Sequence, residues 1–345
     1  MLPITRSSIL LCRRVVNHTS FVRHAQLPQV DPRGPLTPLK KYVFSSYLEF
    51  LKNYDVKLEA KFPAAIRIYR IFKEGFQDFY GDLKGLIIIR KKLRRNFHEL
   101  GCLTRKELEL NMLMPGDMYR VAPVLLISAL PFANYVVFPL AYLLPRQLLC
   151  RHFWTLQQKI QYNVLDQKRR LGYYKPVFRA LQSKLSSLKG HQTHNLWRQC
   201  IAQLGSGLHP GSIKIANVQH LFGNDQVYDL RNLPSSHIRV LLKMHDMHSG
   251  WRRRKRLMER AKMIYNMDLA IIREGGVEAM SQEDIRTACF IRGLNPTNMN
   301  ADETVRWLRE WIKLSTGLKD ESWSFILHLP ILTAYNHPSN WVLIH

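Results

Sequence analysis

The chain is poor in acidic residues. Among its 345 residues, 51 are Lys or Arg and only 26 are Asp or Glu, so the formal net charge at neutral pH is +25. This imbalance favours a polyanionic partner, such as RNA or an anionic membrane surface.

Cysteine is scarce as well, and its spacing excludes two kinds of fold. The cysteines lie about fifty or more residues apart, without a Cys-x-x-Cys pair, so neither a disulfide framework nor a zinc ribbon is expected. We expect reduced, mostly structural thiols. The five are Cys12, Cys102, Cys150, Cys200 and Cys289.

Patterns for metal, cofactor or catalytic chemistry are missing. His245 and His248 could share one helix face, but two histidines without a third ligand are weak evidence for a metal site. The sequence shows no glycine-rich phosphate loop, no Gly-x-Ser-x-Gly elbow and no EF-hand loop. It therefore predicts a non-enzymatic protein with no cofactor and no bound metal.

Residues 1–40 predict a targeting segment and a linker. Residues 1–24 are basic, contain Ser, Thr and Leu, and precede the first acidic residue, Asp31. This composition is typical of a mitochondrial transit peptide, and the alternative is a disordered basic terminus that is never removed. Residues 25–40 hold four prolines, which predict an extended linker.

One long uncharged run contrasts with the basic chain around it. Residues 121–144 include no charged side chain, and at ~1.5 Å per residue a helix of this length exceeds a hydrocarbon core of roughly 30 Å. The run predicts a single transmembrane helix, bent at its prolines, with Asn134 as a candidate contact in a homo-oligomer. The alternative is a buried hairpin of a soluble protein, broken at Pro131. Basic residues on both sides leave the orientation open.

Residues 41–118 predict an amphipathic helical region. Apolar residues recur at spacings of three and four on both sides of Pro63, which indicates two helices. Thr104 and Glu107 then predict a capping box for a short helix leading to Pro115. A basic cluster follows the apolar residues 86–89, a pairing that suits an anionic bilayer surface, with a solvated helix face as the alternative. The cluster comprises Arg90, Lys91, Lys92, Arg94 and Arg95.

Residues 151–345 predict one all-α domain. Gly and Pro divide them into helix-length pieces, and no sustained period-two alternation is present. Their densest positive run must present several side chains to solvent, where RNA, an anionic membrane or a nuclear-import receptor would each accept the charge. An ordinary solvated face is the alternative reading. The run comprises Arg252, Arg253, Arg254, Lys255, Arg256 and Arg260 and follows Trp251.

The segment that begins at Ser281 predicts two packed helices. Ser281 is placed to cap the first, and Asn300 or Asp302 begins the second. In the second helix Trp307 and Trp311 recur at helical spacing with aliphatic residues. For both tryptophans, packing in the core is favoured over stacking on a ligand.

These two helices carry a pattern that resembles the signature of the LETM-type ribosome-binding domain family. The first contains Ala-Cys-x-x-Arg-Gly-Leu, and the second contains Trp-Leu-x-x-Trp-Ile-x-Leu-Ser. Residues 131–154 are similar to the membrane segment of that family and its exit. The residues that carry the pattern are Ala288, Cys289, Arg292, Gly293, Leu294, Trp307, Leu308 and Trp311.

The resemblance implies a location, a fold and a partner. It implies a mitochondrial inner-membrane protein with its C-terminal domain in the matrix, the outer membrane being the alternative location. It also implies a fold similar to the helical repeats of 14-3-3 proteins, and association with mitochondrial ribosomes. Large family members carry a coiled coil and an EF-hand, and this chain shows neither pattern, so calcium sensing is not expected.

Three functions follow as hypotheses. The first is a membrane adaptor that holds the mitochondrial ribosome, or unassembled inner-membrane proteins, near inner-membrane lipids, and so supports translation, respiratory-complex biogenesis and membrane structure. The second is a component or regulator of proton-coupled potassium or calcium exchange, which a lone span without an intramembrane carboxylate could perform only as an oligomer. The third is a regulatory scaffold that binds other proteins.

Overall fold

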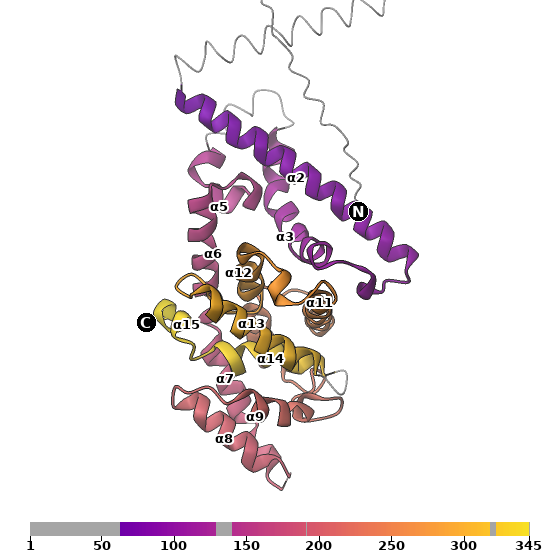
Figure 1. The fold of residues 1–345 in the computed structure, drawn as a ribbon, viewed down its shortest axis with the longest axis vertical. Coiled ribbons are helices and arrows are strands. Elements are labelled where there is room, and N and C mark those ends of the chain that lie inside the picture. The colour runs from indigo at the N-terminus through magenta and orange to yellow at the C-terminus, as the bar shows by residue number, and fades with distance from the viewer. Residues whose placement is uncertain (1–62, 129–139, 191, 318–321, 345) are drawn as a thin grey trace, which may run out of the picture. The chain divides into compact units, whose positions relative to one another are not determined.

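The computed structural model describes residues 63–128, 140–190, 192–317 and 322–344. The chain divides into two compact units, Met1–Ile66 and Arg67–His345. Within the described ranges every regular element is a helix, so the predicted all-α class is confirmed (Figure 1). The predicted presequence, the proline-rich linker and Asn134 lie outside these ranges.

Two long helices begin the described chain. Helix α2 (Pro63–Arg95) is the first of them. After η1 (Leu100–Cys102), helix α3 (Arg105–Ser128) begins with the predicted capping box. The Thr104 N–H donates to Glu107 Oε2 at 2.8 Å, and the Glu107 N–H donates to the Thr104 hydroxyl at 3.3 Å.

Helix α3 is longer than the sequence predicted. It was expected to end near Pro115, yet it continues through Pro115 and Pro123. The physical reason is a buried apolar stripe that crosses both prolines, formed by Leu108, Met114, Val121 and Val124.

The predicted membrane span is described only at its two ends. Residues 121–128 form the last turns of α3, residues 140–143 are helical, and residues 129–139 lie outside the described ranges. None of the helices in the described ranges is long and apolar enough to cross a membrane. The transmembrane helix over residues 121–144 therefore stays a prediction.

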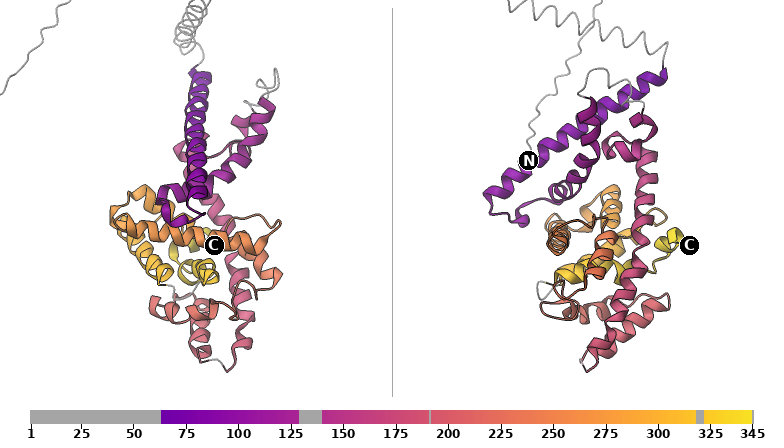
Figure 2. Two further views of the ribbon diagram at one scale, coloured as in Figure 1. Left: turned by 90° about the vertical axis from the view of Figure 1, so that its right-hand side faces the viewer. Right: turned by 180° about the vertical axis from the view of Figure 1, so that it is seen from behind.

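The remaining helices follow α3 in the chain, and among them α14 lies against α7, α11 and η4 (Figures 1 and 2). In chain order they are α5 (Pro145–Leu148), η2 (Arg151–Phe153), α6 (Leu156–Leu171), α7 (Tyr174–Ser183), η3 (Leu185–Leu188), α8 (His194–Gly205), α9 (Ser212–Asn217), η4 (Gln219–Phe222), α10 (Ser235–Met244), α11 (Arg253–Arg273), η5 (Val277–Ala279), α12 (Gln282–Ile291), α13 (Ala301–Thr316), α14 (Trp323–Ala334) and α15 (Pro338–Ile344).

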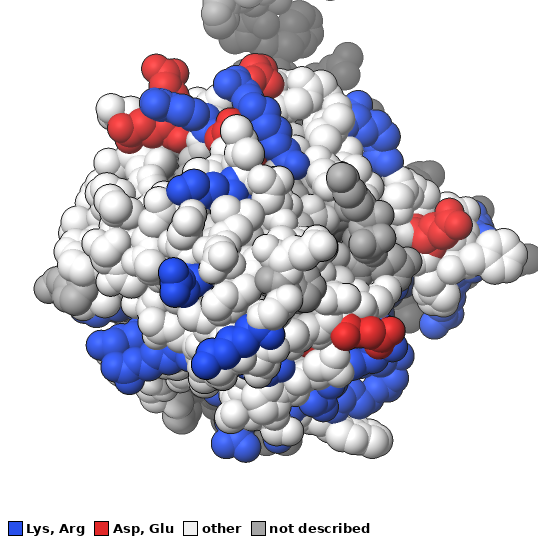
Figure 3. Space-filling view, turned by 90° about the horizontal axis from the view of Figure 1, so that it is seen from below, with Lys and Arg blue, Asp and Glu red and all other residues white. Residues whose placement is uncertain are grey.

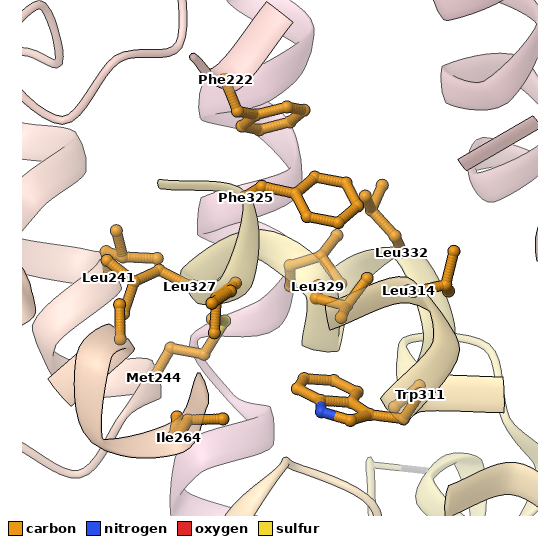
Figure 4. Packing of buried hydrophobic residues seen from close by; sticks show 14 of the residues in the cluster. Phe222, Leu241, Met244, Ile264, Trp311, Leu314, Phe325, Leu327, Leu329 and Leu332 are labelled. Atoms are coloured by element: carbon orange, nitrogen blue, oxygen red, sulfur yellow. The ribbon is translucent and has the colours of Figure 1, made fainter. Parts of the chain in front are cut away.

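Helix α14 forms the centre of the core. Its side chains are buried from residue 324 to residue 332, as expected for a helix that is apolar on all sides. Leu327 lies beside Leu241 and Met244 in Figure 4, and the rings of Phe222 and Phe325 are 5.7 Å apart. The chain turns after α14 and starts α15 at a proline.

The described part of the N-terminal helical region packs on the domain predicted to begin at residue 151. Leu93 of α2 and Leu108 of α3 belong to the same buried cluster as α14. The Arg105 guanidinium also pairs with Asp284 at 2.8 Å, and its backbone N–H donates to Glu274. The two regions therefore share one hydrophobic core.

Candidate polyanion-binding interface

The predicted basic run surrounds the beginning of α11. Arg252 precedes the helix with φ of +55°, a left-handed conformation that is unfavourable for a residue with a side chain. Trp251 is 88% exposed. The first turn of α11 contains no acidic residue. The positive end of the helix dipole therefore repels the cations of this turn, and no carboxylate within the turn offsets that repulsion.

The cations of this run differ in what they contact. Arg252, Arg254 and Lys255 are exposed, whereas Arg253 and Arg256 are half-buried. The Arg254 guanidinium donates to the carbonyls of Leu230 at 3.2 Å and Leu233 at 2.8 Å. The Lys255 ammonium lies 3.9 Å from the carboxylate of Glu259, the distance of a weak pair. Arg254 therefore supports the fold, and Arg252 and Lys255 are the cations best placed for a ligand.

Arg260 also contributes to the fold. Its guanidinium lies in hydrogen-bond reach of the His245 carbonyl, 3.4 Å away. Burial lowers the pKa of Arg260 to about 10, and the nearby charge of Arg170 adds to the shift. The group stays charged at neutral pH but points to the end of α10 rather than to solvent. Figure 3 shows how Lys and Arg dominate the charged side chains over one face of the molecule.

The family pattern forms a buried network instead of a surface. Asp268 of α11 is fully buried and accepts four hydrogen bonds. Two come from Arg292, through Nε at 3.0 Å and Nη2 at 2.5 Å, one from the Trp311 indole at 3.1 Å and one from the Ser315 hydroxyl at 2.7 Å. Arg292 is 1% exposed and also donates to the Ala288 carbonyl. The arginine and tryptophan of the pattern thus fix α12 and α13 on α11.

Gly293 is required by both conformation and space. Its φ is +92°, and a Cβ there would lie 2.1 Å from the Tyr174 hydroxyl oxygen. The Gly293 carbonyl accepts hydrogen bonds from Gln167, Tyr174 and Asn340. A glycine at this point lets three distant elements meet on one backbone oxygen.

The other residues of the pattern are mostly core. Cys289, Leu294 and Leu308 are fully buried. Trp311 packs in the core as predicted. Trp307 is half-buried, donates to the Thr333 carbonyl at 3.3 Å, and lines a groove of about 620 Å³ between α13 and α15.

Sequence reasoning missed two residues of this framework. Asp268 stands in an apolar stretch of α11, and a carboxylate among buried positions is a signal that it has a cationic partner. Arg170 donates to the carbonyls of Met244, Phe290 and Ile291, which end α10 and α12. Nothing local in the sequence marks that role.

The second basic cluster, at the end of α2, is largely exposed. Arg90, Lys91, Arg94 and Arg95 face solvent, while Lys92 pairs with Glu107 at 2.9 Å. As a membrane-surface site, the cluster stays a prediction.

The two histidines considered as metal ligands have other surroundings. The His245 ring contacts the Leu327 carbonyl at 2.9 Å, and burial lowers the pKa of His245 to about 3, so this ring is neutral. The His248 ring accepts a hydrogen bond from the Gly250 N–H. Over the described residues, no three His, Cys, Asp or Glu side chains gather where they could hold a metal ion. The four described cysteines are free, and Cys150, Cys200 and Cys289 are buried.

These observations define an all-helical domain. A buried Arg–Asp pair joins α11, α12 and α13, and a cationic surface surrounds the first turn of α11. The chain belongs to the LETM1-like family. The family described as "LETM1-like, RBD" matches residues 103–332, which include α3, α11 and both helices of the pattern.

Relatives match most of the chain. The LETM1 domain-containing protein 1 of Xenopus tropicalis is 30% identical over 292 residues, covering 83% of this chain and 82% of the relative. The human protein of that name is 26% identical over 311 residues, covering 89% and 86%, and that of Bos taurus is 28% identical over 312 residues. No solved structure matches this chain.

Proposed function

We propose that this protein is a non-enzymatic adaptor of the mitochondrial inner membrane that binds the mitochondrial ribosome on the matrix side. Its contact would be the α11 basic surface, which we define as Trp251, Arg252, Lys255 and Arg256. The observation that carries the proposal is that the first turn of α11 holds only cations and no acidic residue, in a chain with a net charge of +25.

Membership of the LETM1-like family supports the proposal. Ribosomal RNA offers a dense array of phosphates, and each Lys or Arg that meets one releases a bound counterion. Anchoring through the apolar residues 121–144 would raise the effective concentration of ribosomes at the bilayer, so a modest affinity would suffice. Holding ribosomes there would favour insertion of newly made inner-membrane proteins and, through them, assembly of respiratory complexes.

The test is co-sedimentation with ribosomes from solubilised mitochondria at increasing salt. Arg252→Glu with Lys255→Glu should release the protein at lower salt, and loss of two phosphate contacts should reduce the slope of log affinity against log salt by about 2. Arg254 and Arg260 are left unchanged because their guanidinium groups contact backbone carbonyls.

A matched control carries the same charge change elsewhere. Lys175 and Arg179 are exposed and lie four residues apart on α7. Reversing both to Glu should leave ribosome binding close to that of the unchanged protein. Equal losses in the two variants would show that net charge, and not the α11 basic surface, determines binding. Sedimentation as a small complex that salt does not alter would contradict ribosome binding itself.

A further inference from the structure

A stripe of exposed residues runs along α2. Its positions follow one another at spacings of four, four, three, four and three, so they lie on one face of the helix. The residues of this α2 stripe are Phe76, Tyr80, Lys84, Ile87, Lys91 and Arg94. Phe76, Tyr80 and Ile87 are 50–51% exposed, and the adjacent Ile88 is 63% exposed.

A separate face of α2 packs on the protein. Phe79, Leu86, Ile89 and Leu93 are buried there. Among the described helices, those next to α2 lie along one side of it in Figure 1 and in the right-hand view of Figure 2. The core therefore does not account for the large apolar residues of the α2 stripe.

The charges of α2 are sorted between its faces. The exposed Asp78 lies nine residues before Ile87, which at about 100° per residue places it on the other side of the helix. The α2 stripe itself contains no acidic residue, and its Lys84 ammonium lies 4.4 Å above the ring of Tyr80. A solvated helix face would explain the cations but not the large apolar side chains beside them.

The buried face of α2 connects it to both ends of the apolar run. Phe79 and Leu86 share one buried cluster with Val121 and Ala141, which lie before and after residues 129–139. Near those ends Leu126 is 74% exposed and Leu143 is 72% exposed. The α2 stripe thus belongs to the same packed group of helices as the segment proposed to enter the bilayer.

We propose that the α2 stripe lies in the plane of an anionic membrane leaflet. Phe76, Tyr80 and Ile87 enter the boundary between headgroups and acyl chains, while Lys84, Lys91 and Arg94 meet lipid phosphates. The apolar side chains of this face complement the acyl chains, and its cations, with no acidic residue among them, complement the lipid phosphates. The inference rests on the proposed membrane location but not on ribosome binding.

The test places a photo-crosslinking residue on each side of α2 in the full chain. Ile87→benzoylphenylalanine probes the α2 stripe, and Asp78→benzoylphenylalanine is the matched control, because both positions are exposed but face opposite ways. The protein is reconstituted in vesicles of phosphatidylcholine alone or with cardiolipin. We expect a lipid adduct at position 87 in the cardiolipin vesicles, about fivefold or more above that at position 78.

Charge reversal tests the electrostatic half of the proposal. Lys84→Glu, Lys91→Glu and Arg94→Glu, added to the Ile87 probe, should lower the lipid adduct about fivefold or more. Equal adducts at positions 78 and 87, or an adduct at 87 that does not depend on cardiolipin or on these charges, would overturn it. A protein adduct at position 87 in mitochondria, without a lipid adduct, would overturn it in favour of a protein partner.

Separate readouts distinguish this inference from the proposed function. Resistance to alkaline carbonate extraction reports membrane insertion of residues 121–144, and co-sedimentation reports ribosome binding. Membrane insertion or ribosome binding can fail while the lipid adduct at position 87 persists.

The charge-reversal variants need a folding control. The reversed residues are exposed, so an unchanged urea unfolding curve will show that the variants remain folded.

Discussion

The two ends of α11 use charge in opposite ways. Towards the C-terminus, Asp268 is fully buried, and all its hydrogen-bond partners are side chains of the family pattern. At the N-terminus, Arg252 and Lys255 are exposed and nearly without counter-charges. The contrast teaches that the residues by which the family is recognised maintain the fold, while the surface proposed to bind a ligand lies outside the pattern.

Substitutions at the two ends of α11 should change different properties of the protein. A buried ion pair is costly to break on one side, because the remaining charge has no water to solvate it. Exposed cations contribute little to stability, and salt screens them. Changes in the buried network should therefore alter unfolding, and changes in the α11 basic surface should alter binding.

The largest effect is expected from Arg292→Leu. This change leaves the Asp268 carboxylate buried with only the Trp311 indole and the Ser315 hydroxyl as donors, and should cost about 3–5 kcal/mol of unfolding free energy. Urea unfolding followed by circular dichroism measures the loss.

A second variant separates the charge from the packing. Adding Asp268→Asn to Arg292→Leu removes the uncompensated charge, so part of the lost stability should return. A loss below about 1 kcal/mol in the single variant would mean that the ion pair does not organise the domain as described.

Gly293→Ala comes next in size. The new Cβ would meet the Tyr174 hydroxyl and would hold a left-handed φ, so we expect a loss of about 2–4 kcal/mol. The matched control is Gly190→Ala, where φ is +93° and nothing lies within 4 Å of the new Cβ. That variant carries the conformational cost alone, about 1–2 kcal/mol. Equal losses would show that close contact with Tyr174 is unimportant.

Local signals predicted local structure well. Ser281 caps α12 by accepting a hydrogen bond from the Asp284 N–H, as its spacing indicated. Asn300 starts α13 with a capping box to Glu303, which decides between the two starts considered. Caps involve neighbours three residues apart, so a single sequence contains all the information they need.

Contacts between distant residues were beyond prediction. Arg254 contacts carbonyls more than twenty residues earlier, and Gly293 meets Tyr174 across 119 residues. In a run of six cations, the sequence offers no means of telling those that bond to carbonyls from those that face solvent. The length of α3 was missed for a similar reason, because burial by α2 and α11 outweighs the effect of its prolines.

The smallest expected effect is on the unfolding free energy that the protein loses by keeping Arg252 in the α11 basic surface. Arg252→Gly relieves a left-handed conformation and removes a cation from the positive end of a helix. Because these two gains exceed the entropy cost of introducing a glycine, we expect the unfolding free energy to rise by about 0.5–1 kcal/mol. Unfolding should therefore shift to slightly higher urea while ribosome co-sedimentation weakens. Arg252→Asn, which tolerates the same backbone conformation, should reproduce both changes. If stability falls in both variants, Arg252 supports the fold as Arg254 does, and the α11 basic surface shrinks to Trp251, Lys255 and Arg256.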